Sequence, residues 1–228
     1  MNLTARNVSK EFPRKTGSSN CFTALQPLDL TLEAGKLTIV TGRSGSGKST
    51  LLNLFGGLLK PTAGTILAGD TDLYALSDRE LSVFRNSHIG MIPQGQTAIY
   101  SLTVLENVLL PLRLYGKPEQ QDENRARSLL ERLDIAALAD CCPSELSGGE
   151  LRRMAIARAL LPQPEILLAD EPTADLDEEN TEIVFRLMKQ TAGEGCAVML
   201  VTHETCAKAY ADELYTMQNG KLAGGIKK

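Results

Sequence analysis

Residues 42–50 have the types and spacing of a phosphate-binding loop, reading Gly-Arg-Ser-Gly-Ser-Gly-Lys-Ser-Thr. They match the pattern G-x-x-x-x-G-K-[ST], in which glycines let backbone N–H groups approach phosphate oxygens without a Cβ in the way. Lys48 adds a full positive charge for the β- and γ-phosphates, and the Ser49 hydroxyl can bind Mg²⁺. The predicted ligand is a nucleoside triphosphate. The loop residues expected to contact it are Gly42, Ser44, Gly45, Ser46, Gly47, Lys48, Ser49 and Thr50.

Two carboxylates, Asp170 and Glu171, follow the apolar stretch Ile166 to Ala169. Acidic residues after a buried strand are common in ordinary loops, so their meaning depends on the phosphate loop elsewhere in the chain. In an enzyme with such a loop, Asp170 would hold Mg²⁺ directly or through water. Glu171 would lie further out, where it could accept a proton from the attacking water or orient it. The two motifs together favour hydrolysis of the nucleotide.

A second candidate anion site is the stretch Leu146-Ser147-Gly148-Gly149-Glu150, which leads into an expected helix at 150–161. Ser147 and the two glycines would present backbone N–H groups at the positive end of that helix. The alternative is a good N-cap and nothing more, because serine is a preferred N-cap residue. The spacing alone does not explain why one chain would need two phosphate sites.

The elements that must position these motifs alternate between strands and helices. The run 37–41 is β-branched and apolar, as in a buried strand, and 51–55 continues the phosphate loop as a helix. From about 103 to 140 the chain is helical and amphipathic, which we interpret as a helical lobe inserted into an α/β core with a mainly parallel sheet. The other expected strands are 2–8, 22–32, 65–69, 88–92, 166–169 and 197–202, and a further helix is expected at 178–191.

Local signals predict several turns and helix ends. The segment from Pro13 to Asn20 is expected to be a loop, and Ser77 with Glu80 has the pattern of a capping box at a helix start. Asn219-Gly220 predicts a type I′ turn in a closing hairpin. His88 is expected to be an ordinary strand residue.

The composition of the 228 residues excludes several classes of protein. A net charge of −4 and the absence of tryptophan argue against a nucleic-acid surface. No apolar run approaches the ~20 residues that cross a bilayer, and the N-terminus lacks the apolar core of a signal peptide. The five cysteines have no metal-ligand spacing, and the adjacent Cys141 and Cys142 are expected to be half-buried thiols rather than a redox pair. We therefore expect a cytoplasmic enzyme.

With these motifs in this order, the chain resembles the nucleotide-binding subunit of an ATP-binding-cassette (ABC) transporter over nearly its whole length. Leu-Ser-Gly-Gly at 146–149 matches the signature sequence of that family. Gln94 matches its glutamine loop, 174–177 its D-loop and His203 its switch histidine. Phe12 is the best match to the aromatic residue that stacks on adenine, where the family more often has tyrosine.

The resemblance implies one ABC ATP-binding domain over 1–228, with a P-loop ATPase core, an N-terminal antiparallel β subdomain and an inserted helical subdomain. The core would cover about 1–94 and 151–228, and the helical subdomain about 95–150. It also implies a head-to-tail homodimer with two molecules of ATP and with Mg²⁺. Each ATP would then lie between the phosphate loop of one subunit and the signature of the other, which would explain the second anion site.

The resemblance also assigns roles to single residues. Gln94 would arrange Mg²⁺ and water together with Ser49 and Asp170. Glu171 would be the general base, and His203 would contact the γ-phosphate. The residues expected to act on the partner subunit's ATP are Ser147, Gly148, Gly149 and Asp177.

The stretch 76–90, together with 102–108, is similar to the branch that serves permeases for lipoprotein release and for macrolide or antimicrobial-peptide export. A separate membrane permease is the implied partner, with the chain peripheral on the inner face of the cell membrane. There are two departures, because 95–101 differs from the segment that usually faces the permease and Arg152 stands where glutamine is common. Two alternatives stay open: an ATP-switched regulatory or scaffolding module, as in a cell-division type complex, and a soluble ABC ATPase without a membrane partner.

Overall fold

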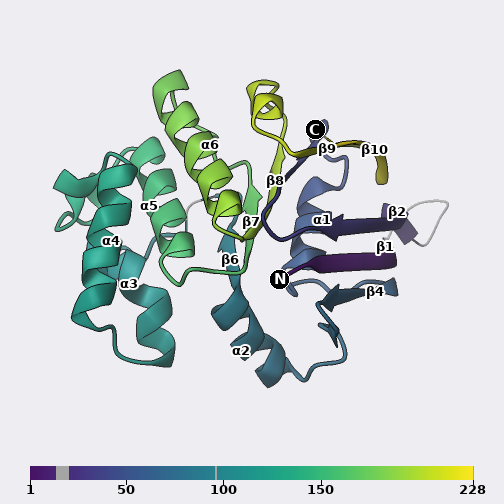
Figure 1. The fold of residues 1–228 in the computed structure, drawn as a ribbon, viewed down its shortest axis with the longest axis horizontal. Helices are drawn as coiled ribbons and strands as arrows, with labels where there is room; N and C mark the ends of the chain where they lie inside the picture. Colours follow the sequence, from purple (N-terminus) through teal and green to yellow (C-terminus); the bar gives the residue numbers. More distant parts are fainter. Residues whose placement is uncertain (14–20, 96, 228) are drawn as a thin grey trace.

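The computed structural model describes residues 1–13, 21–95 and 97–227 as two sheets with helices between and around them (Figure 1). The strands of the larger sheet are β3 Leu37–Thr41, β6 Ile89–Ile92, β7 Ile166–Asp170, β8 Ala197–Thr202, β9 Glu213–Gln218 and β10 Lys221–Lys227. They lie in the order β10-β9-β3-β8-β7-β6, and every pair is parallel except the hairpin of β9 and β10. The predicted mainly parallel sheet is confirmed.

The smaller sheet is antiparallel and lies at the N-terminal side of the molecule. Its strands are β1 Leu3–Pro13, β2 Cys21–Leu32, β4 Ala63–Ala68 and β5 Thr71–Asp72, in the order β2-β1-β4-β5. The pairing of β1 with β2 shifts register between Ala5 and Val8, between Val8 and Lys10, and between Lys10 and Glu11. Such irregularities bend and twist a strand, so the face to which a side chain points cannot be counted along β1.

The helices at 104–115, 120–132 and 148–160 lie together on the left of Figure 1, and the other helices lie nearer the two sheets. Their bounds are α1 Lys48–Phe55, α2 Asp78–His88, α3 Val104–Tyr115, α4 Gln120–Arg132, α5 Gly148–Leu160 and α6 Glu178–Gly193, with 3₁₀ turns at Ala136–Leu138, Pro143–Glu145 and Cys206–Ala209. Helices α3 and α4 lie in the stretch predicted to be a helical lobe; they pack on each other and on α5, which also packs on β6 of the sheet. Among the described residues, none of these helices has both the length and the apolar character needed to cross a membrane.

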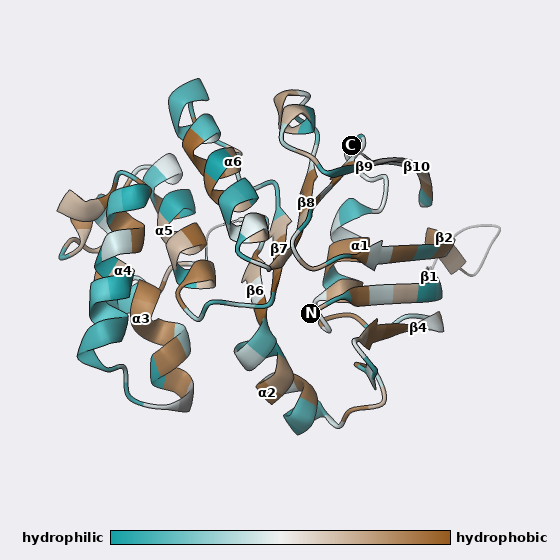
Figure 2. Cartoon of the chain, viewed as in Figure 1, coloured by the Kyte–Doolittle hydropathy of each residue, from teal (hydrophilic) through white to brown (hydrophobic). Residues whose placement is uncertain are grey.

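The two faces of the larger sheet contribute to two apolar cores. Leu37 and Ile39 of β3 pack into a core shared with α5, α6 and the helical lobe, whereas Val40 packs with α1 and the N-terminal sheet. This alternation follows from the two-residue repeat of a strand. Figure 2 shows hydrophobic residues along the central strands and hydrophilic residues over much of α4. The phosphate loop therefore follows a strand, β3, that is buried on both faces.

Most of the local predictions are confirmed. Ser77 caps α2 with Glu80 as a capping box, and Asn219 and Gly220 both have positive φ, as a type I′ turn requires. The prediction for His88 was wrong, because His88 ends α2 and its Nδ1 lies 2.7 Å from Glu165 Oε1. The expected loop at 13–20 lies, apart from Pro13 at the end of β1, outside the described residues.

Candidate active site

A cavity of about 690 Å³ brings together residues from distant parts of the sequence. The phosphate loop forms one wall, and Gln94, Asp170, Glu171 and His203 line it from segments that follow or end β6, β7 and β8. Because these strands are parallel, their carboxyl ends meet at one edge of the sheet, beside the loop after β3. The volume suits a small organic ligand such as a nucleotide. The lining residues from the loop and α1 are Arg43, Ser44, Gly45, Gly47, Lys48, Ser49 and Thr50.

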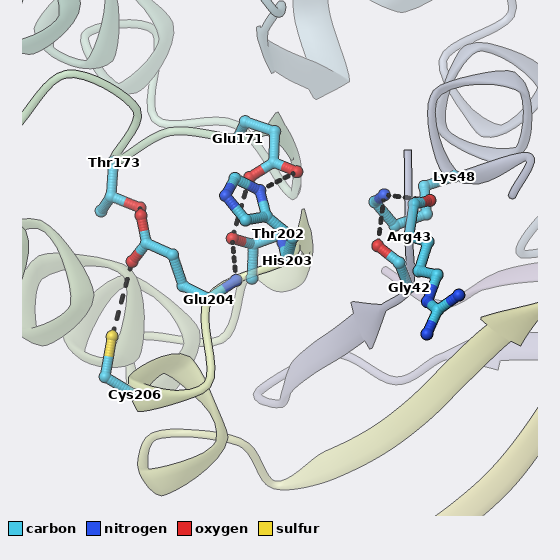
Figure 3. A network of polar contacts seen from close by, with 9 residues as sticks. All are labelled: Gly42, Arg43, Lys48, Glu171, Thr173, Thr202, His203, Glu204 and Cys206. Atoms are coloured by element: carbon cyan, nitrogen blue, oxygen red, sulfur yellow. Dashed lines mark hydrogen bonds and ion pairs between the residues drawn. The ribbon is translucent and has the colours of Figure 1, made fainter. Parts of the chain in front are cut away.

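The phosphate loop turns into α1 through Gly47, which has φ 109°. No described side chain caps α1, so the first backbone N–H groups of the helix remain to bind an anion. The Lys48 side chain is buried, and its Nζ donates to the carbonyl oxygens of Gly42 at 2.8 Å and Arg43 at 3.2 Å (Figure 3). Gly42 and Ser46, both predicted to contact the nucleotide, are not among the residues that line the cavity, and a Cβ on Gly42 would lie 2.8 Å from Ser46 Oγ.

Asp170 ends β7 with a carboxylate that is only 5% exposed. Burial raises the pKa of this carboxyl group, and a hydrogen bond from Ser49 opposes that shift. A carboxylate beside a hydroxyl offers the oxygen ligands that Mg²⁺ uses when water and nucleotide phosphates complete its shell. Within the described ranges, no group of three His, Cys, Asp or Glu residues could hold a metal ion by itself. The donor set at Asp170 therefore fits a metal that arrives with a nucleotide.

Glu171 is held by the segment that ends β8 (Figure 3). Its Oε2 accepts from Thr202 Oγ1 at 2.9 Å and from the backbone N–H of His203 at 3.4 Å, and its Oε1 lies 3.0 Å from His203 Nδ1. The backbone of Glu171 has φ +48°, which is uncommon for a residue with a side chain and is found where the surroundings enforce it. The buried carboxylate and the exposed imidazole are thus set side by side at the cavity.

The pairing with Glu171 gives His203 a predictable titration. The hydrogen bond from His203 to Glu171, and then the charge of Glu171, raise the pKa of His203 above its ordinary value. The imidazolium–carboxylate pair therefore stabilises the fold below about pH 6.5, the pKa of an unfolded histidine, and this stabilisation is lost as pH rises through the raised pKa. NMR titration of the imidazole should show the raised pKa in the wild type and a lower pKa in Glu171→Gln. Equal values in both proteins would contradict the assigned pairing.

Two residues at the cavity were not singled out from the sequence. Thr202 ends β8 and orients Glu171, and the only local signal for it is a hydroxyl residue directly before His203. Phe22 is 42% exposed and lines the cavity, whereas Phe12 does not. The two rings lie on directly opposed residues of β1 and β2, and Lys10 Nζ is 5.1 Å from the centre of the Phe12 ring. Of the two rings, Phe22 is the one that lines the cavity in this structure.

The signature residues lie apart from this cavity. Ser147 is the N-cap of α5, and its Oγ accepts a hydrogen bond from the backbone N–H of Glu150 at 3.3 Å. A separate hollow of about 260 Å³ lies beside them. Within one chain, the signature and the phosphate loop therefore do not share a cavity. The residues lining the hollow are Ser147, Gly148, Gly149, Arg153, Asp175, Leu176, Asp177 and Asn180.

The fold and the site define a nucleotide-binding ATPase of the phosphate-loop class. The model of the ABC transporter family matches residues 25–174. The chain is 40% identical over 202 residues to the lipoprotein-releasing system ATP-binding protein LolD of Chromohalobacter salexigens, covering 88% of this chain and 85% of that protein. It is 38% identical to the ABC transporter ATP-binding protein YtrE of Bacillus subtilis, covering 93% of this chain and 92% of that one.

The solved structures agree. The dimeric structure of MJ0796, a bacterial ABC transporter cassette, superposes with a TM-score of 0.91 at 34% identity, covering 99% of this chain and 98% of that one. A dimeric post-hydrolysis state of the same cassette, bound to ADP and Pi, superposes with a TM-score of 0.90. The chain belongs to the ABC transporter family, in the branch of lipoprotein-release ATP-binding proteins, and it hydrolyses ATP.

Proposed function

We propose that this chain is the ATP-hydrolysing subunit that powers a separate membrane permease, and that it works on the inner face of the cell membrane. The observation that carries the ATPase half of this proposal is the single cavity shared by the phosphate loop, Gln94, Asp170, Glu171 and His203. A buried carboxylate at hydrogen-bonding distance from an imidazole, opposite a phosphate loop, is suited to water attack on a terminal phosphate.

The roles follow from the contacts. Lys48 and the N–H groups at the start of α1 bind the phosphates, and the Lys48 ammonium exchanges its bonds to loop carbonyls for phosphate oxygens. Ser49, Asp170 and Gln94 would hold Mg²⁺, which supplies charge neutralisation on the phosphates when it is bound. Glu171 accepts the proton of the attacking water. Thr202 and His203 hold the carboxylate in place, and His203 extends toward the γ-phosphate.

A homodimer accounts for the second hollow. The signature hollow lies outside the phosphate-loop cavity. Each of them is lined by the N-terminus of a helix, α5 for the hollow and α1 for the cavity, and helix N-termini suit anions. In a head-to-tail pair, Ser147, Gly148 and Gly149, with Asp177, would close over the ATP of the other subunit. ATP would then favour the dimer by mass action, and hydrolysis would release it. The similar MJ0796 cassette is dimeric, which supports this arrangement.

A groove of about 380 Å³ between the helical lobe and the larger sheet is suited to the permease. Leu58 and Leu114 rise from its two sides with 55% and 68% of their surface exposed, and Ile89, Met91 and Pro111 form more of its lining. Exposed apolar side chains in a lined hollow mark interaction sites rather than ordinary surface. The groove would receive a short apolar helix of the permease, so that opening and closing of the cassette pulls on the membrane protein.

The segment 95–101, which departs from the pattern of the family, lies next to this groove. Hydrogen bonds hold the residues of it that the structure describes. Asn107 is fully buried, and its side chain accepts from the backbone N–H of Ile99 and donates to the carbonyls of Ile99, Leu102 and Thr103. Arg158 donates to the carbonyl of Thr97. We infer that this segment, with Ile99 40% exposed, helps to select the particular permease.

Recovery of the partner tests the proposal. The tagged chain should bring down a polytopic membrane protein in stoichiometric amount from detergent-solubilised membranes of its host. Leu114→Asp should reduce that recovery at least tenfold, because it places a charge in the apolar groove. Asn124→Asp adds the same charge on an exposed part of α4 outside the groove and should leave both recovery and ATPase activity unchanged. Equal recovery with Leu114→Asp, in a variant that unfolds at the wild-type temperature, would exclude this groove.

A further inference from the structure

A buried arginine, Arg152, lies between the signature helix and the catalytic cavity. It belongs to α5, five residues after the N-cap Ser147, and only 8% of its surface is exposed. Burying a guanidinium is costly unless it is paired and hydrogen-bonded, which raises the question of what holds it.

One nitrogen of Arg152 is bonded to the segment that carries Gln94. Its Nη1 donates to the carbonyl oxygen of Pro93 at 2.8 Å, and Pro93 directly follows β6. That carbonyl belongs to the same planar peptide unit as the backbone nitrogen of Gln94. A hydrogen bond to this oxygen therefore fixes the orientation of the Pro93–Gln94 peptide plane, and with it the position from which the Gln94 side chain extends into the cavity. Glutamine at position 152 would have a shorter reach and a single amide group for this contact.

The charge of Arg152 is balanced by carboxylates around the site. Burial lowers the pKa of Arg152, and the carboxylates of Asp175, Asp170 and Glu171 oppose the shift by favouring the charged form. Asp170 and Glu171 line the cavity, and Asp175 lies in the segment beside the signature hollow. The guanidinium therefore lies in the field of groups from both sites, with its planar fork suited to more than one partner.

Helix α5 carries this contact between two parts of the molecule. It packs on α3 and α4 in the helical lobe and on β6 in the larger sheet, and it begins at the signature. A shift of α5 relative to the sheet would move Arg152 and, through the Pro93 carbonyl, the backbone of Gln94. Hydrogen bonds are directional, so a small displacement of the donor changes the geometry of the peptide that accepts it.

We propose that Arg152 is a positioning residue for ATP hydrolysis, which sets the position of Gln94 by holding the Pro93 carbonyl and couples that position to the signature helix. The inference rests on the proposed function, in which Gln94 arranges water and the metal at the γ-phosphate. It assigns Arg152 no contact with the nucleotide. Its loss should consequently lower turnover. The affinity for ATP, which the phosphate loop determines, should stay unchanged.

A double-mutant cycle between Arg152 and Gln94 tests this proposal. Arg152→Met keeps an apolar stem but removes the donor, and it should lower kcat about tenfold, as expected for a misplaced catalytic group, with the KM for ATP changed less than threefold. Gln94→Ala should lower kcat at least as much. If Arg152 acts through Gln94, the double variant has the kcat of Gln94→Ala alone, whereas independent effects would multiply and overturn the proposal.

Further variants separate positioning from general loss of structure. Arg152→Lys keeps a charged donor and should recover most of the lost kcat. Arg125→Met is the matched control, because Arg125 is a partly buried arginine that donates to a backbone carbonyl, that of Leu161, away from the cavity. It should keep wild-type kcat even where its thermal unfolding temperature falls. Calorimetric titration should give the same ATP affinity for wild type and Arg152→Met.

The outcomes for the two proposals are distinct. A wild-type chain that binds ATP but hydrolyses none would overturn the proposed function, and the inference with it. Normal hydrolysis in the wild type, with an Arg152→Met variant within twofold of wild-type kcat, overturns the inference alone. A loss of ATP affinity equal to the loss of kcat would also overturn it, since a fault in the phosphate loop would then explain both.

Discussion

Replacing Glu171 by glutamine is expected to lower ATP turnover by about 10²- to 10⁴-fold, the range supplied by a well-placed general base. The substitution keeps the shape of the side chain and an oxygen that can accept the hydrogen bond from Thr202 Oγ1. It removes the negative charge that would take a proton from water. Steady-state release of phosphate from MgATP, with the purified chain, measures the effect.

The same variant should bind ATP with nearly wild-type affinity and accumulate as a dimer. Hydrolysis would normally release the closed pair, so a chain that binds without hydrolysing shifts the equilibrium toward the dimer. Light scattering after size exclusion, with and without ATP, reports this directly. Glu165→Gln is a suitable control, because Glu165 is an acid that precedes the other end of β7 and pairs with His88 outside the cavity. Turnover close to wild type in Glu171→Gln would remove Glu171 from its assigned role.

Gly47→Ala is expected to weaken ATP binding by about 100-fold or more. Gly47 has φ +109°, and a Cβ on it would lie 2.7 Å from the carbonyl oxygen of Ala24 and 3.0 Å from Leu25 Cδ2. Backbone strain of about 1–3 kcal/mol and a packing clash of about 1–3 kcal/mol would together move the loop, and each 1.4 kcal/mol is tenfold in affinity. Isothermal titration calorimetry with ATP measures the change.

A second glycine separates strain from position. Gly69 also has positive φ, +57°, but a Cβ there meets nothing within 4 Å and the residue lies outside the cavity. Gly69→Ala should therefore cost about 1–2 kcal/mol of stability through its backbone alone and leave ATP affinity unchanged. If Gly47→Ala binds ATP as tightly as Gly69→Ala does, the close approach of β2 to the phosphate loop does not shape the site.

What the sequence alone determined is local. The glycines and Lys48 of the phosphate loop, the capping box at Ser77 and the turn at Asn219-Gly220 depend on φ preferences and on contacts within a few residues. The repeat of apolar residues likewise predicted the strand before Asp170. These features could be predicted because the φ preferences of single residues, bonds to residues a few positions away and short apolar runs are visible in the sequence itself.

What only the tertiary structure decided depends on which strands become neighbours. Glu171 meets His203 because β7 and β8 are adjacent, and Phe22 rather than Phe12 lines the cavity because β2, through Ala24, lies against the phosphate loop. Because β1 contains register shifts, the alternation of residues along the sequence does not predict which of the two aromatic side chains faces the cavity. The bond from Arg152 to the Pro93 carbonyl likewise joins residues 59 positions apart. Contacts of this range are set by the packing of whole elements, which no local pattern contains.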